Sequence, residues 1–453
     1  MSNGHPSDQD YEIAIIGAGL AGGLIALALI ARKPDIRLLL IDGADRAGGN
    51  HMWSFFDSDV SDEGRALLAP LVTHRWERGH QVRFPGYDRA IDIAYNSIAS
   101  RQFDAHVRAT LGNRLRLNQP VKALSSRQVT LANGETLAAR AIIDARGFPS
   151  PVGNAHNGTK TTIAHSTEYG PAAYSPDEKH AANSPAPLSA GSFLRDDEAQ
   201  ADAKTNPVST LACGWQKFVG QTLRLSSPHS LNRPIIMDVR VDQLGGYRFV
   251  YVLPTGPQEI FVEDTYYTDG PQLDIPTVRA RITEYAAAQG WQIEAVEHEE
   301  TGVLPVVKAG DFARFWPGSD TVARAGVRAG LFHPTTGYSL PMAVDFALAL
   351  ADAAPMDGMA LGTWARNRAA QHWRSGGYYR MLDTMLFDAA PPEERYRIFE
   401  RFYQLPEPLI MRFYAGRSSF ADKIRILCGK PPVRIRAAIR AIITRNSIKR
   451  KGV

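Results

Sequence analysis

The chain has 453 residues, of which 44% are hydrophobic and 22% charged, with a net charge of +4. This length exceeds one typical hydrophobic core and predicts two or three domains. Cys213 and Cys428 are the only cysteines, which excludes a disulfide framework and a clustered zinc site. We do not expect the polar start MSNGHPSDQD to act as a signal peptide, so the sequence favours the reducing cytoplasm.

The uncharged stretch 13–31, IAIIGAGLAGGLIALALIA, permits two interpretations. Its length approaches the roughly 20 apolar residues that cross a bilayer. The alternative is a short buried strand followed by a helix, with glycines at G-x-G-x-x-G spacing between them. Such glycines let a pyrophosphate approach the N–H groups at a helix N-terminus. They are Gly17, Gly19 and Gly22.

A second predicted strand, 36–41, favours the nucleotide-binding interpretation. It ends at Asp42, 20 residues after Gly22, where a carboxylate would accept hydrogen bonds from the ribose of an adenine dinucleotide. A polar, glycine-rich loop follows, whereas NAD-binding domains usually continue into another helix. Flavoproteins place such a loop along FAD, so the sequence predicts FAD. The loop's candidate cofactor residues are Gly48, Gly49, Asn50 and His51.

Two later segments are expected to return to the same cofactor. The sequence 140–146, RAIIDAR, predicts a buried strand ending at Asp144. The loop around 326–337 precedes a predicted helix from 339 to 350 and would deliver the N-terminus of that helix toward the flavin. For His333 alone, an ordinary hydrogen-bonded loop histidine remains an open alternative. The candidate residues of this loop are Gly330, His333, Pro334 and Gly337.

The predicted fold class is α/β, with a Rossmann-like FAD-binding domain of the two-dinucleotide-fold flavoprotein type. This domain is expected to be discontinuous, and an antiparallel sheet would form a separate substrate domain. The segment 152–209, rich in Ala, Pro, Ser, Asn and Asp, is interpreted as an inserted flexible loop, either linker or lid. The predicted parts are 10–75, 105–151 and 320–365 for FAD, 76–104 and 210–319 for substrate, and 366–453 for a helical C-terminal region.

An antiparallel hairpin is predicted from the runs GYRFVYVLP and IFVEDTYY, which begin at Gly246 and Ile260. Side chains alternate along a strand, so Glu263 and Asp264 should face opposite sides. If Glu263 faces a cavity with the aromatic residues of the hairpin, desolvation would raise its pKa and make it a general acid. The alternative is two solvated acids on an exposed strand.

The C-terminal segment 423–453 contains ten Lys or Arg and no Asp or Glu, so the rest of the chain carries a net charge of −6. From Val433, basic residues alternate with Ile and Ala at helical spacing. This pattern suits an amphipathic helix on an anionic membrane surface. A solvated basic helix packed on the core is the alternative. No nucleic-acid partner is expected, because no interleaved aromatic platform accompanies the charge.

Several strings along the chain resemble bacterial lycopene β-cyclases. The resemblance covers nearly the whole sequence and is specific, because several of these strings are not found in generic FAD hydroxylases. The clear departure is the segment 152–209, which is longer than the usual connection in that family. The strings are GGNHMWSF, WQKFVGQ, RPIIMDVRV, GYRFVYVLP, FVEDTYY, GLFHPTTGYSLP, RFYAGR and ILCGKPPV.

The resemblance implies the reaction. Lycopene would be cyclised at its ψ ends to γ-carotene and then β-carotene, with reduced FAD, NAD(P)H as electron donor and no net redox change. The acidic strand motif would supply the catalytic residues Glu263 and Asp264, with the reduced flavin as an alternative proton donor. Peripheral attachment to the inner face of the cytoplasmic membrane is also implied. The candidate substrate-binding residues are Phe249, Tyr251 and Phe261.

Two other classes of protein share the predicted fold. An FAD-dependent monooxygenase or isoprenoid oxidoreductase would contain the same glycines and Asp42, but would consume NAD(P)H in proportion to its product. A non-catalytic isoprenoid-binding protein, of the kind of the Rab GDP-dissociation inhibitors, would also reuse the fold. The intact glycine fingerprint favours a flavin-containing enzyme over this last class.

Overall fold

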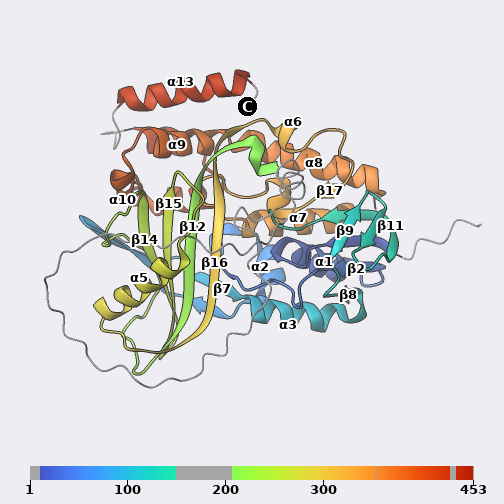
Figure 1. The fold of residues 1–453 in the computed structure, drawn as a ribbon, viewed down its shortest axis with the longest axis horizontal. Coiled ribbons are helices and arrows are strands. Elements are labelled where there is room, and N and C mark those ends of the chain that lie inside the picture. The colour runs from blue at the N-terminus through green and yellow to red at the C-terminus, as the bar shows by residue number, and fades with distance from the viewer. Residues whose placement is uncertain (1–10, 149–206, 355, 429–434, 452–453) are drawn as a thin grey trace, which may run out of the picture.

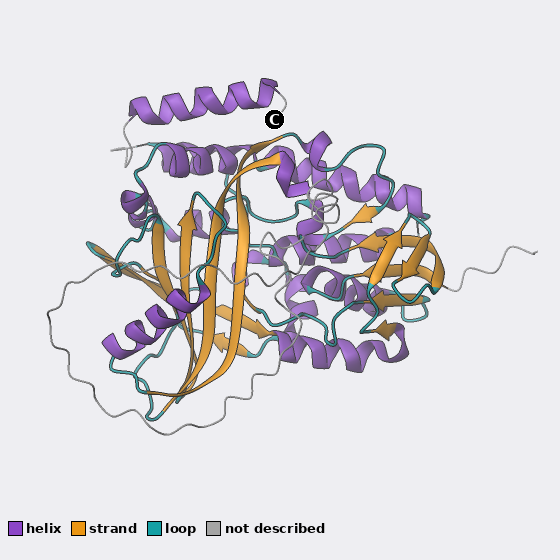
Figure 2. Ribbon diagram, viewed as in Figure 1, coloured by secondary structure: helices purple, strands orange, loops and turns teal. Residues whose placement is uncertain are grey.

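The computed structural model describes residues 11–148, 207–354, 356–428 and 435–451. These residues form an α/β structure in which two large sheets stand side by side, with helices across one end (Figures 1 and 2). A third, three-stranded sheet is smaller. The predicted insertion 152–209 lies almost entirely outside the described residues, and only its last residues are seen, in the short 3₁₀ turn Pro207–Thr210.

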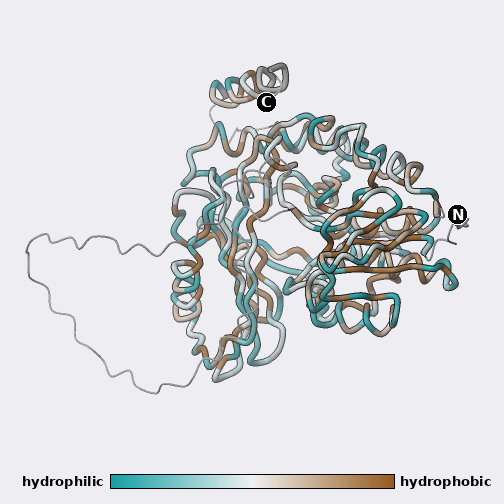
Figure 3. Tube along the Cα trace, turned by 45° about the vertical axis from the view of Figure 1, so that its right-hand side comes forward, coloured by the Kyte–Doolittle hydropathy of each residue, from teal (hydrophilic) through white to brown (hydrophobic). Residues whose placement is uncertain are grey.

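The first sheet is the predicted dinucleotide-binding unit. Its strands run in the order β8-β2-β1-β11-β10-β9, with β17 beside β11, and β1 pairs in parallel with both β2 and β11. Strands β1 and β2 and the last residues of β11 are mostly apolar, whereas β10 alternates apolar and polar residues, and hydrophobic stretches are brown in Figure 3. The strands are β1 Tyr11–Ile16, β2 Leu38–Ile41, β8 Leu115–Arg116, β9 Val121–Leu124, β10 Gln128–Leu131, β11 Thr136–Asp144 and β17 Ala323–Arg324.

Helix α1, Leu20–Arg32, follows β1 after the turn 17–19. The helix is buried against α7, Leu340–Ala353, and α3, Ser100–Leu111, which explains why it is apolar nearly all round. No helix in the described part of the chain is long and apolar enough to cross a membrane. The stretch 13–31 is therefore a strand, a turn and a core helix rather than a membrane span.

The second large sheet has the strand order β16-β12-β15-β14-β13-β5-β6. The predicted hairpin is present as β14 and β15, and the long strands β12 and β16 extend the sheet beside β15. Helix α5, Ile275–Ala288, covers its outer face. The strands are β5 His80–Phe84, β6 Tyr87–Ile91, β12 Leu211–Leu225, β13 Ile235–Asp238, β14 Tyr247–Gly256, β15 Glu259–Thr268 and β16 Ile293–Gly310.

The small sheet crosses a predicted domain boundary. Strand β3, Met52–Phe56, from the segment assigned to the FAD-binding domain, pairs with β7, Tyr95–Ala99, from the segment assigned to the substrate domain. Strand β4, His74–Trp76, pairs with the other edge of β7. The short helix α2, Asp62–Leu68, lies between β3 and β4 in the chain. This sheet therefore connects the two large sheets, so they share a continuous framework at this point.

Helices make up the C-terminal region, as predicted. Helix α9 contacts β16, and α13 lies along α9 at the top of Figure 1. The tail helix begins at Ile435, two residues after the start of the pattern that predicts it. The remaining helices are α6 Phe312–Phe315, α8 Gly358–Ser375, α9 Gly377–Asp388, α10 Tyr396–Phe402, α11 Glu407–Tyr414, α12 Phe420–Leu427 and α13 Ile435–Lys451.

Candidate active site

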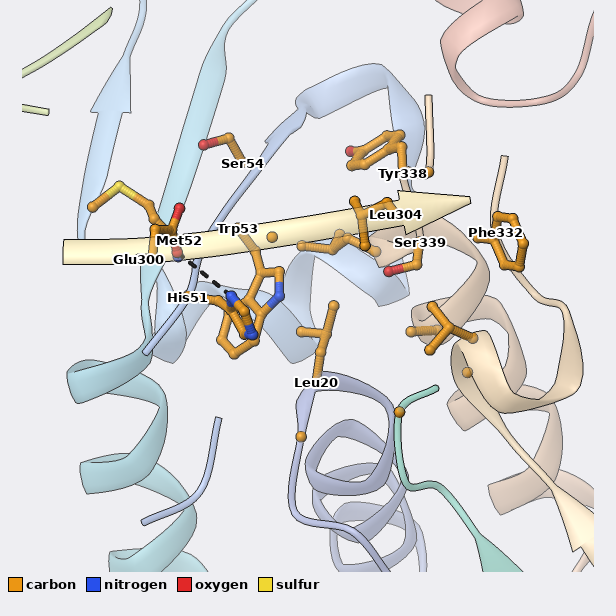
Figure 4. Close-up of a pocket in the computed structure, with 18 of the residues that line it drawn as sticks. Leu20, His51, Met52, Trp53, Ser54, Glu300, Leu304, Phe332, Tyr338 and Ser339 are labelled. Carbon is orange, nitrogen blue, oxygen red and sulfur yellow. Dashed lines mark hydrogen bonds and ion pairs between the residues drawn. The ribbon is translucent and has the colours of Figure 1, made fainter. Parts of the chain in front are cut away.

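A cavity of about 810 Å³ lies between the two large sheets and is lined by residues from both. One part is bounded by the glycine-rich turn before α1 and by the start of α7. The opposite part is bounded by β14, β15 and β16 of the large antiparallel sheet. Figure 4 shows Leu20 of α1, Glu300 and Leu304 of β16, and Tyr338 and Ser339 before α7 around the same space. The cavity thus joins a nucleotide-binding edge to an aromatic pocket.

The part of the cavity beside the glycine-rich turn, here called the glycine end, is shaped to accept an anion. Gly17 has a φ of +103°, a conformation that L side chains rarely adopt. A Cβ on Gly19 would meet no protein atom within 4 Å, and Gly19 lines the cavity. The first turn of α1 contains no acidic residue and has no side-chain cap, so its N–H groups and dipole favour negative charge. Gly48, Gly49 and His51 of the following loop also line the cavity, as does Asp42.

Asp42 lies at the end of β2, where the fingerprint predicts it. Its carboxylate accepts hydrogen bonds from the backbone N–H groups of Ala18, at 2.6 Å, and Ala44, at 2.8 Å. These contacts fix the carboxylate between the glycine turn and the polar loop. The start of α7 approaches the same space, because Gly337 and Ser339 line the cavity and the first turn of α7 also lacks acidic residues.

Three of the predicted cofactor residues do not line the cavity. Gly22 faces the turn instead: a Cβ there would lie 1.9 Å from the carbonyl oxygen of Gly17, so this glycine permits close packing of helix and strand. The Asn50 amide donates to the carbonyl of Glu299 at 3.1 Å. Asp144 forms ion pairs with Arg146 and Arg328, and of these three residues only Arg146 lines the cavity.

Gly330, His333 and Pro334, which the sequence also assigned to the cofactor, are three further residues that do not line the cavity. These residues are absent from the cavity lining, while Phe332 and Thr336 on either side belong to it. Gly330 instead ends a 3₁₀ turn with a φ of +74°. His333 is fully buried against the rings of Tyr379 and Phe413, and burial lowers its pKa to about 3, so it is neutral. The loop histidine is therefore a core residue.

The other end of the cavity contains the predicted acid. Glu263 lines it together with Phe249 and Tyr251. The Thr265 hydroxyl donates to Glu263 Oε1 at 2.6 Å, and within the described chain no Lys or Arg forms an ion pair with this carboxyl group. Burial, followed by repulsion from Glu300, raises the pKa of Glu263 to about 8 despite the hydrogen bond from Thr265. At neutral pH Glu263 therefore holds a proton.

Phe261 and Asp264 occupy positions that differ from their predicted roles. Phe261 is on the same face as Glu263 but is fully buried behind the cavity wall, edge-on to Tyr251. Asp264 points to the opposite face, as strand alternation requires. There it pairs with Arg248 through contacts of 2.9 and 3.0 Å and accepts a 2.6 Å hydrogen bond from the Tyr266 hydroxyl. Asp264 is thus a structural residue with no access to the cavity.

Sequence reasoning missed a second acidic residue of the cavity, Glu300 on β16. Its Oε2 accepts a hydrogen bond from the Met52 N–H at 2.9 Å and lies 3.5 Å from His51 Nδ1, the contact dashed in Figure 4. The sequence does contain a signal for Glu300, because side chains an even number of residues apart on a strand point to the same face. Leu304, which lines the cavity, and Val306, which is buried, lie on the same face as Glu300. The alternation of inward and outward side chains is hard to recognise in the sequence, because residues 297–300, EHEE, are all polar or charged.

Sequence reasoning also missed a chain of hydrogen-bonded hydroxyl groups in the cavity. Tyr251 and Tyr95 contact through their hydroxyl oxygens at 3.0 Å, and the Tyr251 hydroxyl donates to Ser54 Oγ at 2.9 Å. All three residues line the cavity. They fix the tyrosine rings beside Glu263, so the acid faces a wall of aromatic faces. Such faces stabilise cations through their quadrupoles.

Comparison with solved structures defines the class of fold. The chain resembles a flavin-dependent brominase with a TM-score of 0.55 and 12% identity, covering 97% of this chain and 98% of that one. It also resembles HpxO of Klebsiella pneumoniae complexed with FAD, with a TM-score of 0.52, 11% identity and coverage of 90% and 98%. The chain therefore shares the fold of these flavin-dependent proteins, which confirms the predicted flavoprotein fold class.

Sequence relatives define the family within that class. The model described as "Lycopene cyclase protein" matches residues 12–440. Lycopene beta-cyclase of Pantoea ananas is 40% identical over 96% of this chain and 98% of its own length. Lycopene beta-cyclase of Paracoccus sp. is 36% identical over 97% and 99%. The chain belongs to the lycopene cyclase family, which confirms the resemblance noted in the sequence.

Proposed function

We propose that this chain is a lycopene β-cyclase that closes the ψ ends of lycopene to β rings, by way of γ-carotene to β-carotene. The observation that carries this function is Glu263. It is a carboxyl group that faces a large aromatic cavity, has no basic partner among the described residues, and holds its proton at neutral pH. Those are the properties of a general acid for an apolar substrate.

The chemistry assigned to Glu263 is transfer of its proton to C2 of the terminal double bond. The cation left at C1 is attacked by the C5–C6 double bond, and loss of the C6 proton completes the β ring without net oxidation or reduction. The faces of Phe249, Tyr251 and Tyr95 lie in the same cavity and stabilise positive charge there.

The glycine end fits the FAD that the fold class implies. Gly19 leaves room for close approach of a pyrophosphate, Gly17, Gly48 and Gly49 line the same end of the cavity, and the Asp42 carboxylate there could accept hydrogen bonds from a ribose. The N-termini of α1 and α7 both offer uncapped N–H groups to an anion. When bound there in its reduced form, FAD would supply negative charge beside the developing cation, with NAD(P)H as the source of electrons.

The direct test is expression in a lycopene-accumulating bacterium, followed by pigment analysis and then by anaerobic assays of purified protein with lycopene in liposomes. We expect β-carotene as product, with reductant consumed only to reduce the flavin once. Consumption of one NAD(P)H and one oxygen for each product molecule would instead indicate a monooxygenase. Lycopene bound without conversion would indicate a carrier protein.

Gly19→Val tests the cofactor end separately. Because a Cβ at Gly19 meets no protein atom and projects into the cavity, we expect a folded but colourless protein. Gly22→Ala is the contrast, since its Cβ collides with the Gly17 carbonyl and should lower the thermal midpoint as well. Stoichiometric FAD in folded Gly19→Val protein would contradict the proposed cofactor site.

Peripheral attachment to the inner face of the cytoplasmic membrane is part of the proposed function, because lycopene dissolves in lipid. On α13, buried Ala438 and Ala441 face the protein, whereas Ile439 and Ile443 are exposed. Helix α12 adds an apolar stripe, in which Phe420 is 79% exposed. Basic residues accompany both helices, which suits an anionic lipid surface. The exposed apolar residues are Phe420, Ile424, Leu427, Ile439 and Ile443.

Sedimentation with liposomes tests this attachment. Deletion of residues 430–453 should weaken binding to anionic vesicles, and binding of the intact chain should fall as salt increases. Phe420→Ser should weaken the part of binding that salt does not remove. Salt-independent binding that survives both changes would place the membrane contact on another surface.

A further inference from the structure

Glu263 and Glu300 lie on the same face of the large sheet, on the two strands that flank β12. Gly220 of β12 pairs with Glu263 on one side and with Glu300 on the other. Side chains at these three positions therefore point the same way, into the cavity that both glutamates line. Two carboxyl groups from distant parts of the chain therefore lie on either side of one residue, Gly220.

That single residue has no side chain to separate them. A Cβ on Gly220 would lie 2.5 Å from the ring of Phe261 and 3.3 Å from Cγ of Glu300. The Glu300 side chain therefore leans over Gly220 in the direction of β15, and the Phe261 ring fills the rest of the space. The glycine allows the two carboxyl groups to interact inside the protein.

The surroundings of the two carboxyl groups differ. Glu300 accepts a hydrogen bond from the Met52 N–H and lies 3.5 Å from His51, so its ionised form has two stabilising partners. Glu263 has one neutral partner, the hydroxyl of Thr265. Glu300 repels the ionised form of Glu263, and this repulsion adds to the effect of burial in raising the pKa of Glu263.

We propose, on the basis of the function proposed above, that Glu300 is a positioning residue that acts through Glu263: its fixed negative charge keeps the reactive proton on Glu263. Glu300 itself need not contact the substrate. The proton balance of ring closure is unchanged, since Glu263 gives one proton to C2 and one proton leaves C6. Glu300 sets the pH range over which Glu263 can begin the reaction.

The other groups that face Glu263 do not replace this role. On its own face, β14 presents Tyr251, β15 presents Tyr267 and β7 presents Tyr95, and burial raises the pKa of all three phenols, so they stay neutral. Asp264 contributes weakly from the opposite face, where Arg248 neutralises it. His51 lies 3.5 Å from Glu300, and its side chain is 46% exposed.

The test compares Glu300→Gln with Glu299→Gln. Glu299 is the preceding residue, carries the same charge, and pairs with Arg279 on the other face of the strand. The infrared band of the protonated Glu263 carboxyl, identified by its loss in Glu263→Gln, is titrated in each purified protein. The alkaline limb of the anaerobic pH–rate profile is measured in parallel.

We expect Glu300→Gln to move both the infrared midpoint and the alkaline limb to lower pH by roughly 1 unit, the scale of strongly interacting sites. Glu299→Gln should leave the infrared midpoint and the alkaline limb unchanged. Glu300→Asp keeps the charge, so its midpoint and alkaline limb should lie close to those of the unaltered protein. Should Glu300→Gln fail to fold, Glu300→Asp and a His51→Gln variant would still report the coupling through the band.

An infrared midpoint that is the same in Glu300→Gln and in the unaltered protein would overturn the inference. This result is distinguishable from failure of the proposed function, because the band reports the proton on Glu263 whether or not lycopene is converted. A shifted band in a protein that does not cyclise lycopene would support the coupling and reject the function.

Discussion

On the outer face of the large sheet, Asp264 is held by Arg248 in a fully buried, two-contact ion pair. On the inner face, one residue earlier in the same strand, Glu263 meets aromatic rings, a hydroxyl and a second carboxyl group. Both residues have a carboxyl group, and they are consecutive in strand β15. Burial raises the pKa of both carboxyl groups, but the Arg248 guanidinium opposes the rise at Asp264, whereas repulsion from Glu300 adds to it at Glu263.

The comparison shows how one sheet can supply both stability and reactivity. Helix α5 covers the outer face with apolar side chains, and the carboxyl group there is compensated in place. The inner face is left partly open as a cavity, and its acid is uncompensated. An uncompensated acid costs stability, and we therefore propose the inner face as the reactive one.

The largest expected effect is on the outer face. Asp264→Asn leaves the buried Arg248 guanidinium without its charge partner, and we expect a loss of about 3 kcal/mol in the free energy of unfolding. Denaturant titration measures it. The flavin bound per folded molecule should stay unchanged, since Asp264 does not reach the cavity. A variant as stable as the unaltered protein would mean that the ion pair contributes little.

On the inner face, Glu263→Gln keeps the shape of the side chain and removes its proton. We expect the rate of ring closure to fall by at least ~10²-fold, the contribution of a positioned general acid. Flavin content should be retained and the free energy of unfolding should not fall, in contrast to Asp264→Asn. Near-normal cyclisation by flavin-loaded Glu263→Gln would remove Glu263 as the essential acid and transfer the proton to the reduced flavin.

The smallest expected effect is the dependence of stability on pH. The pKa of Glu263 is raised from 4.5 to about 8 in the folded protein, so its contribution is complete below pH 4.5 and is lost as the pH rises toward 8. Glu263→Gln should therefore gain stability relative to the unaltered protein between pH 5 and pH 8. Because the carboxyl group faces the cavity, the slope should stay below the limit of about 1.4 kcal/mol per pH unit.

Glu299→Gln is the control for this measurement. Burial raises the pKa of Glu299, but the Arg279 guanidinium and the Gln221 amide outweigh that effect and lower it overall. Its contribution to stability is therefore already complete at pH 5. We expect a constant difference between pH 5 and pH 8, and a slope equal to that of Glu263→Gln would assign the pH dependence to another group.

Local patterns predict much of this molecule. The glycine fingerprint places Gly17, Gly19 and Asp42 correctly at the cavity, because strand, turn and helix are adjacent in the sequence. The alternation of the hairpin separates Glu263 from Asp264 for the same reason. In both cases the geometry follows from a few consecutive residues.

The sequence does not predict the orientation of side chains that depends on contacts with residues far along the chain. The orientation of His333 is decided by the C-terminal residues Tyr379 and Phe413, which a loop pattern cannot reveal. The meeting of Glu300 with Glu263 depends on the register of both strands with Gly220. The small sheet of β3, β4 and β7 likewise joins segments that the sequence assigns to different domains.

The central claim is that a proton from this cavity begins ring closure. Cyclisation of lycopene by the flavin-loaded protein in D₂O under anaerobic conditions, followed by mass and NMR analysis of the product, tests it most directly. Proton transfer to C2 predicts one deuterium for each ring, so β-carotene should contain two, both at C2-type positions. Product without solvent deuterium, formed at the normal rate, would contradict acid-initiated cyclisation.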